Sequence, residues 1–225
     1  MKKALVILTN VAQYGNDPEP TGLWLAEAAD FVIALQKKGI EVDYASAKGG
    51  KVPLDPRSLK KAYRSPEVDK LYHTDDFQTR ALKNSLAIKD VDPKNYFAIY
   101  FTGGHGVLWD FPNNSEFERV TQQIYQAKGY VLSVCHGLAG LIFQKDAQNQ
   151  PLLAKKTITT AEELLSGKFR KVPFLTEKEA KKAGAHFKQH LPFTSYAVRD
   201  GRIITGQNPM SGTQVANLLL ESLGI

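Results

Sequence analysis

The sequence predicts an α/β fold in which one doubly wound, mostly parallel sheet is sandwiched between helices. Short apolar runs of strand length alternate with helical segments along the chain. The apolar run 3–9, the helical stretch 23–38 and the run 40–46 form a βαβ unit, and such a unit pairs its two strands in parallel. A chain of 225 residues suits one domain over 1–225.

The remaining elements continue the same alternation. The stretch 47–90 is polar and contains three prolines, so we expect an insertion that covers the site on one side of the sheet. Tyr96–Phe101 and Tyr130–Val134 predict two more buried strands, with a helix at 115–128 between them. A hairpin turning at Asp200-Gly201 precedes a last helix. A site in such a fold lies at the carboxyl ends of the strands.

The composition favours a globular cytoplasmic protein and argues against membrane and nucleic-acid-binding proteins. Hydrophobic residues make up 43% of the chain and charged residues 23%, which is typical of a globular protein. The single cysteine leaves no internal disulfide, which favours a reducing, cytoplasmic compartment. The first apolar run, 4–8, is too short for a signal peptide or a membrane span. The net charge is +6, but the lysines are scattered, so no nucleic-acid partner is expected.

Cys135, the only cysteine, follows the strand Tyr130–Val134 directly and precedes His136. The segment 138–143 then has helical composition, so the layout is that of a nucleophile elbow. Such a turn exposes the thiol at the carboxyl end of the sheet, and the start of a helix behind it favours the thiolate. The alternative is a buried cysteine that packs as a small hydrophobic side chain. The position beside His136 favours the nucleophile.

Glu27 lies on the apolar side of the first helix, at helical spacing from Leu23, Phe31 and Ala34. A carboxylate there is unfavourable unless it is protonated or paired. The alternative is a position at the rim of the helix. We favour a functional Glu27, because burial raises the pKa of a carboxyl towards the range of a proton carrier.

The strand Tyr96–Phe101 runs into the glycine loop Thr-Gly-Gly-His-Gly. Gly103 and Gly104 allow the backbone to approach a ligand closely, and His105 is either a functional residue of this candidate substrate site or an ordinary loop histidine. The spacing fits neither a P-loop nor a dinucleotide fingerprint, so no nucleotide cofactor is expected. His73 with two neighbouring aspartates is interpreted as a solvated loop, and no metal site is expected.

Four features in order, taken together, resemble the ThiJ/PfpI superfamily. They are the mid-helix Glu27, the Gly-Gly-His-Gly loop 103–106 followed by Trp-Asp-Phe-Pro at 109–112, the Val-Cys-His-Gly elbow 134–137, and the segment 200–209. The resemblance covers essentially the whole chain and is strongest to the glyoxalase III branch, which overlaps with heat-inducible holding chaperones. The superfamily is related to class I glutamine amidotransferases, which implies a flavodoxin-like sheet.

The resemblance implies roles for individual residues. Cys135 is the nucleophile, Glu27 the protonated acid that touches its sulfur, and His136 the neighbouring base. Backbone amides near Gly104 and His136 form the oxyanion site. It also implies a homodimer, a small reactive aldehyde as substrate, and no cofactor.

A third acid is expected downstream of the elbow. The segment 159–163 is shorter than the corresponding family segment, and Glu163 is preferred over Glu162. The downstream histidines His186 and His190 lie in His-Phe-Lys-Gln-His, without the His-x-Glu of glutamine amidotransferases, so glutaminase activity is not expected.

The chemistry that these residues imply is a glutathione-independent glyoxalase, a lyase of the D-lactate dehydratase type. A Cys135 thiolate, with a pKa of about 3.5 to 7.5, adds to a 2-oxoaldehyde such as methylglyoxal. Glu27 or His136 then moves a proton between the two carbons, and water releases lactate. The alternatives are a stress-response holding chaperone or redox sensor in which Cys135 is oxidised, and a cysteine-dependent deglycase or peptidase-type hydrolase.

Overall fold

The computed structural model describes residues 3–161 and 171–225. Its centre is a seven-stranded sheet in the order β10-β11-β7-β6-β1-β4-β5. Neighbouring strands pair in parallel, except that β10 runs antiparallel to β11. The predicted fold class is therefore confirmed. The strands of this sheet are β1 Lys3–Leu8, β4 Val42–Ser46, β5 Leu86–Ala87, β6 Tyr96–Phe101, β7 Tyr130–Val134, β10 Ala197–Asp200 and β11 Ile203–Gly206.

Two small two-stranded sheets lie outside the main one. They pair β2 with β3 and β8 with β9. Their bounds are β2 Gln13–Tyr14, β3 Asp17–Pro20, β8 Thr157–Ile158 and β9 His186–Phe187. The α-helices are α1 Leu25–Gln36, α2 Pro66–Tyr72, α3 Val107–Asp110, α4 Ser115–Gln126, α5 Ala139–Ile142, α6 Thr176–Lys182 and α7 Gly212–Leu223.

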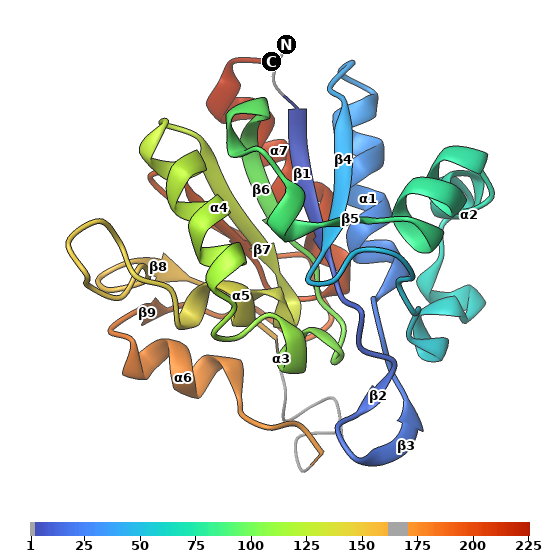
Figure 1. Cartoon of the computed structure of the whole chain (residues 1–225), viewed down its shortest axis with the longest axis horizontal. Coiled ribbons are helices and arrows are strands. Elements are labelled where there is room, and N and C mark those ends of the chain that lie inside the picture. Colours follow the sequence, from blue (N-terminus) through green and yellow to red (C-terminus); the bar gives the residue numbers. More distant parts are fainter. Residues whose placement is uncertain (1–2, 162–170) are drawn as a thin grey trace.

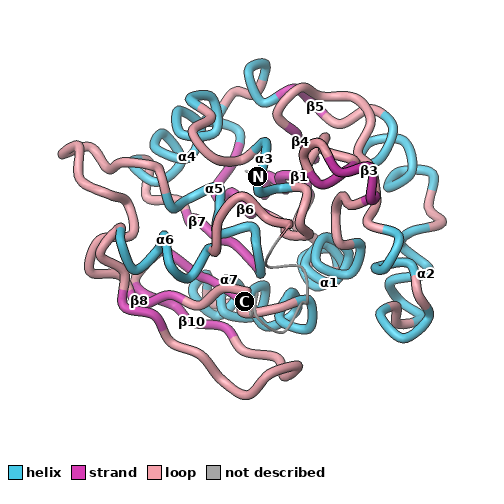
Figure 2. The backbone as a smooth tube through the Cα atoms, turned by 90° about the horizontal axis from the view of Figure 1, so that it is seen from below, coloured by secondary structure: helices cyan, strands magenta, loops and turns pink. Residues whose placement is uncertain are grey.

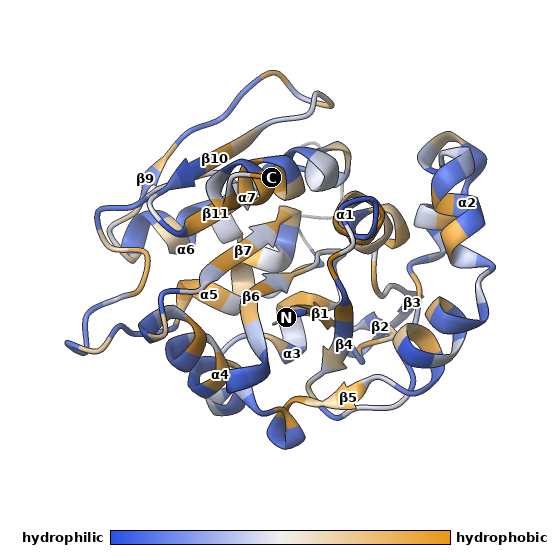
Figure 3. Ribbon diagram, turned by 90° about the horizontal axis from the view of Figure 1, so that it is seen from above, coloured by the Kyte–Doolittle hydropathy of each residue, from blue (hydrophilic) through white to orange (hydrophobic). Residues whose placement is uncertain are grey.

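Helices cover both faces of the main sheet. Figure 3 shows α1 and α7 on one face, with α4, α3 and α5 on the other. Side chains of β1 alternate between the two faces, as the pleat of a strand requires. Val6 and Leu8 join the buried cluster formed with α1 and α7, whereas Leu5 and Ile7 join the cluster under α4. This two-sided burial explains why β1 is apolar from Ala4 to Leu8.

The helix α1 is fixed to the sheet by an aromatic contact. The rings of Phe31 and Tyr100 stack with their centroids 3.8 Å apart. The Tyr100 hydroxyl donates a hydrogen bond of 2.9 Å to the backbone carbonyl of Glu27. Because Glu27 lies one turn before Phe31 on α1, these contacts also fix the position of its side chain over the sheet.

The inserted segment 47–90 lies beside α1 and β4 (Figure 1). It contains the short 3₁₀ turn η1 Pro56–Leu59, the helix α2 and the edge strand β5. Val68 and Phe77 from this segment belong to the same buried cluster as α1. The insertion therefore extends both the sheet and the core.

The carboxyl ends of the parallel strands point towards the hairpin β2–β3 in Figure 1, and Figure 2 views the molecule from that side. The connections that follow β1, β6 and β7 meet at this edge. Among the described residues, no helix combines the length and the apolar character needed to cross a membrane.

Replacing Phe31 by alanine should lower the free energy of unfolding by about 3 to 5 kcal/mol, because removing a fully buried ring leaves a cavity against Tyr100. Urea unfolding followed by circular dichroism measures the change. Leu223→Ala is the control, since this side chain is 39% exposed, and it should stay within about 0.5 kcal/mol of the original chain. Equal losses in the two variants would contradict the anchoring role of Phe31.

Candidate active site

The cysteine lies at a strained turn directly after β7. Cys135 has a φ of 53°, in the left-handed region that non-glycine residues rarely adopt. Its side chain lines a cavity although the residue is only 7% exposed. The helix expected at 138–143 is shorter than predicted: a 3₁₀ turn, η6 Cys135–Leu138, precedes the four-residue α5. A helix this short supplies only a weak dipole, so the groups packed around the sulfur matter more.

The carboxyl of Glu27 lies under the glycine loop. The residue is fully buried, and its Oε2 accepts a hydrogen bond of 2.7 Å from the backbone N–H of Gly103. Burial raises the pKa of Glu27 to about 8, although hydrogen bonds to Cys135 and to Gly103 oppose the shift. Glu27 therefore keeps its proton near neutral pH while in hydrogen-bond contact with Cys135.

Gly103 is a glycine because nothing larger fits between the acid and the thiol. A Cβ at this position would lie 2.4 Å from Oε2 of Glu27 and 3.0 Å from Cβ of Cys135. The amide of Gly103 therefore serves Glu27 in this structure, whereas the sequence suggested that it would face substrate. Gly104 lines the cavity.

His136 lies beside the thiol as a neutral imidazole. Its Nδ1 is 3.3 Å from the Cys135 sulfur. Burial holds the pKa of His136 well below its usual range, and the nearby Arg57 guanidinium lowers it further. A neutral imidazole can accept a proton from the thiol or from a bound substrate. A protonated acid, Glu27, and an unprotonated base, His136, therefore both contact the sulfur of Cys135.

Sequence reasoning missed the group that surrounds His105. Arg57 Nη2 lies 2.9 Å from Nδ1 of His105 and donates to the Tyr14 hydroxyl at 2.8 Å. The carboxylate of Asp55 accepts from Nε and Nη2 of Arg57 at 2.9 and 2.6 Å. These residues lie in loops and short turns far apart in the sequence, where no periodicity signals a function.

The cavity that holds these groups has a volume of about 290 Å³. Glu27, Cys135, His105 and His136 line it at the carboxyl edge of the sheet. The insertion covers one side with three further lining residues, Arg57, Lys60 and Tyr63. The rest of the lining includes Trp24, Ala161, Phe193, Asn208, Pro209 and Met210.

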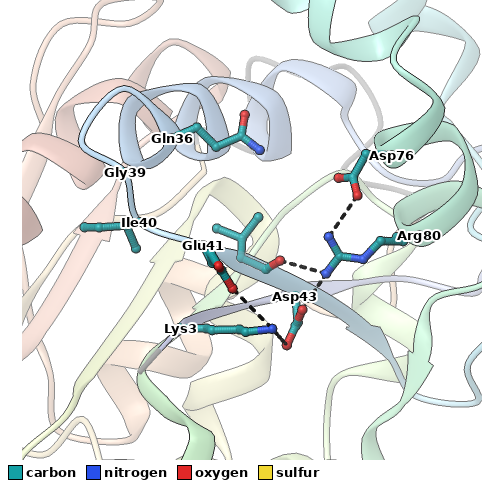
Figure 4. Close-up of a pocket in the computed structure, with 9 residues that line it drawn as sticks. Lys3, Gln36, Gly39, Ile40, Glu41, Asp43, Asp76 and Arg80 are labelled. Atoms are coloured by element: carbon teal, nitrogen blue, oxygen red, sulfur yellow. Dashed lines mark hydrogen bonds and ion pairs between the residues drawn. The ribbon is translucent and has the colours of Figure 1, made fainter. Parts of the chain in front are cut away.

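A larger hollow of about 700 Å³ lies at the opposite, amino-terminal end of β1 and β4 (Figure 4). Its charged groups pair with one another. Lys3 contacts Glu41 and Asp43 at 3.4 and 3.5 Å, and Arg80 contacts Asp76 at 2.9 Å as well as Asp43. This hollow has neither a thiol nor a histidine in its lining. The smaller cavity is therefore the candidate active site.

Glu163 and its alternative Glu162 lie outside the described residues, so the identity of the third acid stays a prediction. Within residues 3–161 and 171–225, no group of three or more His, Cys, Asp or Glu side chains is arranged to hold a metal ion.

The sequence matches the family model described as the DJ-1/PfpI family over residues 25–222. The chain belongs to the DJ-1/PfpI family. This family is also called ThiJ/PfpI, so the resemblance seen in the motifs is confirmed. The matched region spans α1, the glycine loop, the cysteine elbow and α7.

Two curated relatives and two solved structures are similar to the chain over nearly its whole length. The glutathione-independent glyoxalase HSP31 of Saccharomyces cerevisiae is 32% identical, covering 99% of this chain and 98% of that protein. Glyoxalase 3 of Candida albicans is 31% identical over 96% of both, and the structure of glyoxalase III from that organism matches with a TM-score of 0.87 at 29% identity, covering 98% and 97% of the two chains. Rapid Encystment Protein 24 kDa of Francisella tularensis matches with a TM-score of 0.94 at 37% identity over 99% of both chains.

Replacing Glu27 by glutamine should remove a pH-dependent loss of stability. As pH rises from 4.5, the ordinary pKa, to about 8, the folded-state pKa, the unfolded chain releases this proton while the folded chain keeps it. The original chain should therefore lose up to roughly 1.4 kcal/mol per pH unit relative to Glu27→Gln across this window. Urea unfolding at several pH values measures the difference. Parallel stability curves for the two proteins would show that Glu27 is not buried as a neutral acid.

Proposed function

We propose that this chain is a glutathione-independent glyoxalase that converts 2-oxoaldehydes such as methylglyoxal to the hydroxy acid. The observation that carries the proposal is the arrangement around one thiol: the protonated Glu27 and the neutral His136 both contact Cys135 inside a small cavity. Similarity over the full chain to proteins named as glutathione-independent glyoxalases supports it.

The first step forms a hemithioacetal. The thiol proton passes to Nδ1 of His136, and the Cys135 sulfur bonds to the aldehyde carbon of the substrate. The carbonyl electron pair moves onto oxygen, which then takes the proton back from His136. The short distance from Nδ1 to the sulfur places the imidazole beside the carbon that has just been attacked.

The second step moves hydrogen between the two carbons. His136, neutral again, takes the proton from the sulfur-bearing carbon while the ketone oxygen takes the proton of Glu27, which yields an enediol. Glu27 then removes the hydroxyl proton on the sulfur-bearing carbon, and His136 delivers its proton to the neighbouring carbon. The product is a thioester of the 2-hydroxy acid, and both side chains have returned to their starting states.

The opposite pKa shifts of the two side chains suit this exchange. Glu27 begins as a donor because its pKa is raised, and His136 begins as an acceptor because its pKa is lowered. Water finally hydrolyses the thioester and frees the Cys135 thiol. The overall change adds one water molecule to the 2-oxoaldehyde and needs no net oxidant or reductant.

Cys135→Ala should abolish lactate formation from methylglyoxal in the absence of glutathione, because the chain has no other thiol. Loss should exceed roughly 10³-fold in kcat, since no covalent intermediate can form. Coupled lactate detection on purified protein measures turnover, and circular dichroism checks the fold. The exposed-site variant Leu223→Ala is the matched control and should keep full activity. Turnover by Cys135→Ala would refute the catalytic assignment.

A holding chaperone is the second candidate. Leu191 and Phe193 are 67% and 71% exposed, and Tyr63 at the cavity mouth is 46% exposed. Large exposed apolar side chains of this kind can capture unfolded chains when they form a contiguous patch. The yeast relatives carry heat-shock names, which is consistent with this activity.

Aggregation suppression should be weak, and it should survive Cys135→Ala because it does not use the thiol. Light scattering of a heated client protein measures it. Leu191→Ser, a change at an exposed side chain that is absent from the cavity lining, should reduce it while methylglyoxal turnover by Cys135 persists. Strong suppression at stoichiometric concentration, with no lactate formed by the original chain, would make the chaperone the primary function.

The family resemblance and the single cysteine also predict the oligomeric state and the cellular location of the protein. We expect a homodimer in the cytoplasm that acts on a small aldehyde without a cofactor. Light scattering coupled to size-exclusion chromatography determines the mass in solution.

A further inference from the structure

The histidine of the glycine loop is held by residues from two segments outside the main sheet. Tyr14 comes from the hairpin β2–β3 and Arg57 from the turn η1 of the insertion. The Tyr14 hydroxyl is 2.6 Å from Nδ1 of His105, and Arg57 Nη2 is 2.9 Å from the same atom. His105 lies 91 residues from Tyr14 and 48 from Arg57 in sequence, so folding alone creates this contact.

The chemistry of arginine decides which ring nitrogen carries the proton. A guanidinium group has only N–H donors and no acceptor. A proton on Nδ1 of His105 would face this donor at 2.9 Å with no acceptor on Nη2 to receive it, so Nδ1 is assigned as the unprotonated nitrogen. Tyr14 is consistent with this assignment, because its hydroxyl accepts from Arg57 and donates its own proton towards Nδ1. Burial raises the pKa of Tyr14 to about 12, so the phenol keeps that proton.

Arg57 is itself fixed on the side away from His105. The fully buried carboxylate of Asp55 binds it through two hydrogen bonds, and Thr21 donates a third bond of 3.0 Å to this carboxylate. The guanidinium also lies over the rings of Tyr14 and Trp24, at 5.9 and 5.8 Å from their centroids. Paired hydrogen bonds and stacking leave the guanidinium little freedom to reorient.

His105, whose orientation is fixed by Arg57 and Tyr14, lies next to the reacting groups His136 and Cys135. Its ring contacts the ring of His136, with centroids 4.5 Å apart, and both histidines line the cavity with Cys135. Since Nδ1 faces Arg57 and Tyr14, the proton must be on Nε2, which lies across the ring from these partners. The neutral form also suits the surroundings, because a second positive charge beside Arg57 would be unfavourable.

We propose that Arg57 and Tyr14 are positioning residues that hold His105 in the neutral Nε2–H tautomer, so that His105 is a fixed hydrogen-bond donor to the oxygens of a substrate bonded to Cys135. The identity of those oxygens rests on the proposed glyoxalase function, whereas the tautomer does not. His105 keeps its proton throughout the reaction. It stabilises the negative charge on oxygen while Glu27 and His136 exchange protons.

The tautomer can be measured directly, without turnover. Two-bond ¹H–¹⁵N correlation spectra of the full chain, labelled with ¹⁵N-histidine, distinguish the two neutral forms from the imidazolium. The chain has five histidines, and the signal missing in His105→Gln identifies His105. At neutral pH we expect the Nε2–H form. An Nδ1–H form or an imidazolium at His105 would overturn the proposal, whatever the activity.

Two conservative variants test the positioning role. Tyr14→Phe keeps the ring, and Arg57→Lys keeps a cation for the buried Asp55, so both should fold. Each should lower kcat for methylglyoxal by roughly tenfold, the effect of one misplaced hydrogen bond, with little change in KM, and should shift the His105 spectrum towards a mixture of tautomers. Arg64→Lys is the matched control, because Arg64 lies in the same insertion and pairs with Asp69 at 3.0 Å.

The donor role is tested by replacement of His105 itself. His105→Leu should lose roughly 10²- to 10³-fold in kcat, as removal of an oxyanion donor does. His105→Gln, whose amide can donate from a similar position, should recover at least about tenfold of that loss. Equal kcat in the leucine and glutamine variants, or full activity in Tyr14→Phe and Arg57→Lys, would overturn the proposal. No turnover by the original chain, together with an Nε2–H His105, would instead refute the glyoxalase function and with it the donor role.

Discussion

The structure around the thiol depends on the burial of one carboxyl. The Glu27 carboxyl is enclosed between α1 and the glycine loop, and within residues 3–161 and 171–225 the backbone of Gly103 and the neighbouring Cys135 hydrogen-bond to it. An ionised carboxylate at such a position is strongly disfavoured, so the folded chain keeps the proton. The stacked rings of Phe31 and Tyr100 hold the same helix against the sheet, and this contact keeps the Glu27 carboxyl buried.

The backbone strain at Cys135 is maintained by the strands on either side of β7. A left-handed cysteine persists only when its surroundings leave no alternative. Here the strand β7 is paired on both sides, by β6 and β11, up to the residues that precede the turn. The turn then directs the sulfur back towards Glu27 and His136. The same groups that fix the thiol also determine its chemistry, because each can exchange a proton with a substrate attached to it.

The insertion has two functions in this arrangement. Its apolar residues, such as Phe77, add to the core beside α1, and its polar end forms one wall of the cavity. This wall also supplies polar groups to the site. The guanidinium of Arg57, fixed by the buried Asp55, places N–H donors at the edge of the cavity. The hairpin β2–β3 contributes Tyr14, which contacts both Arg57 and His105.

The sequence by itself determined the fold class and the central residues, because both depend on local patterns. Alternating apolar runs specify a parallel sheet, and the position of Cys135 at the end of such a run specifies an elbow. Glu27 was recognisable as an acid on an apolar helix face. Tertiary structure alone decided the rest: that the helix after the elbow is short, that Gly103 serves Glu27, and that Arg57 meets His105. These contacts join residues far apart in the chain, and they form only when the packing of the insertion and the hairpin against the sheet brings their side chains within hydrogen-bond distance.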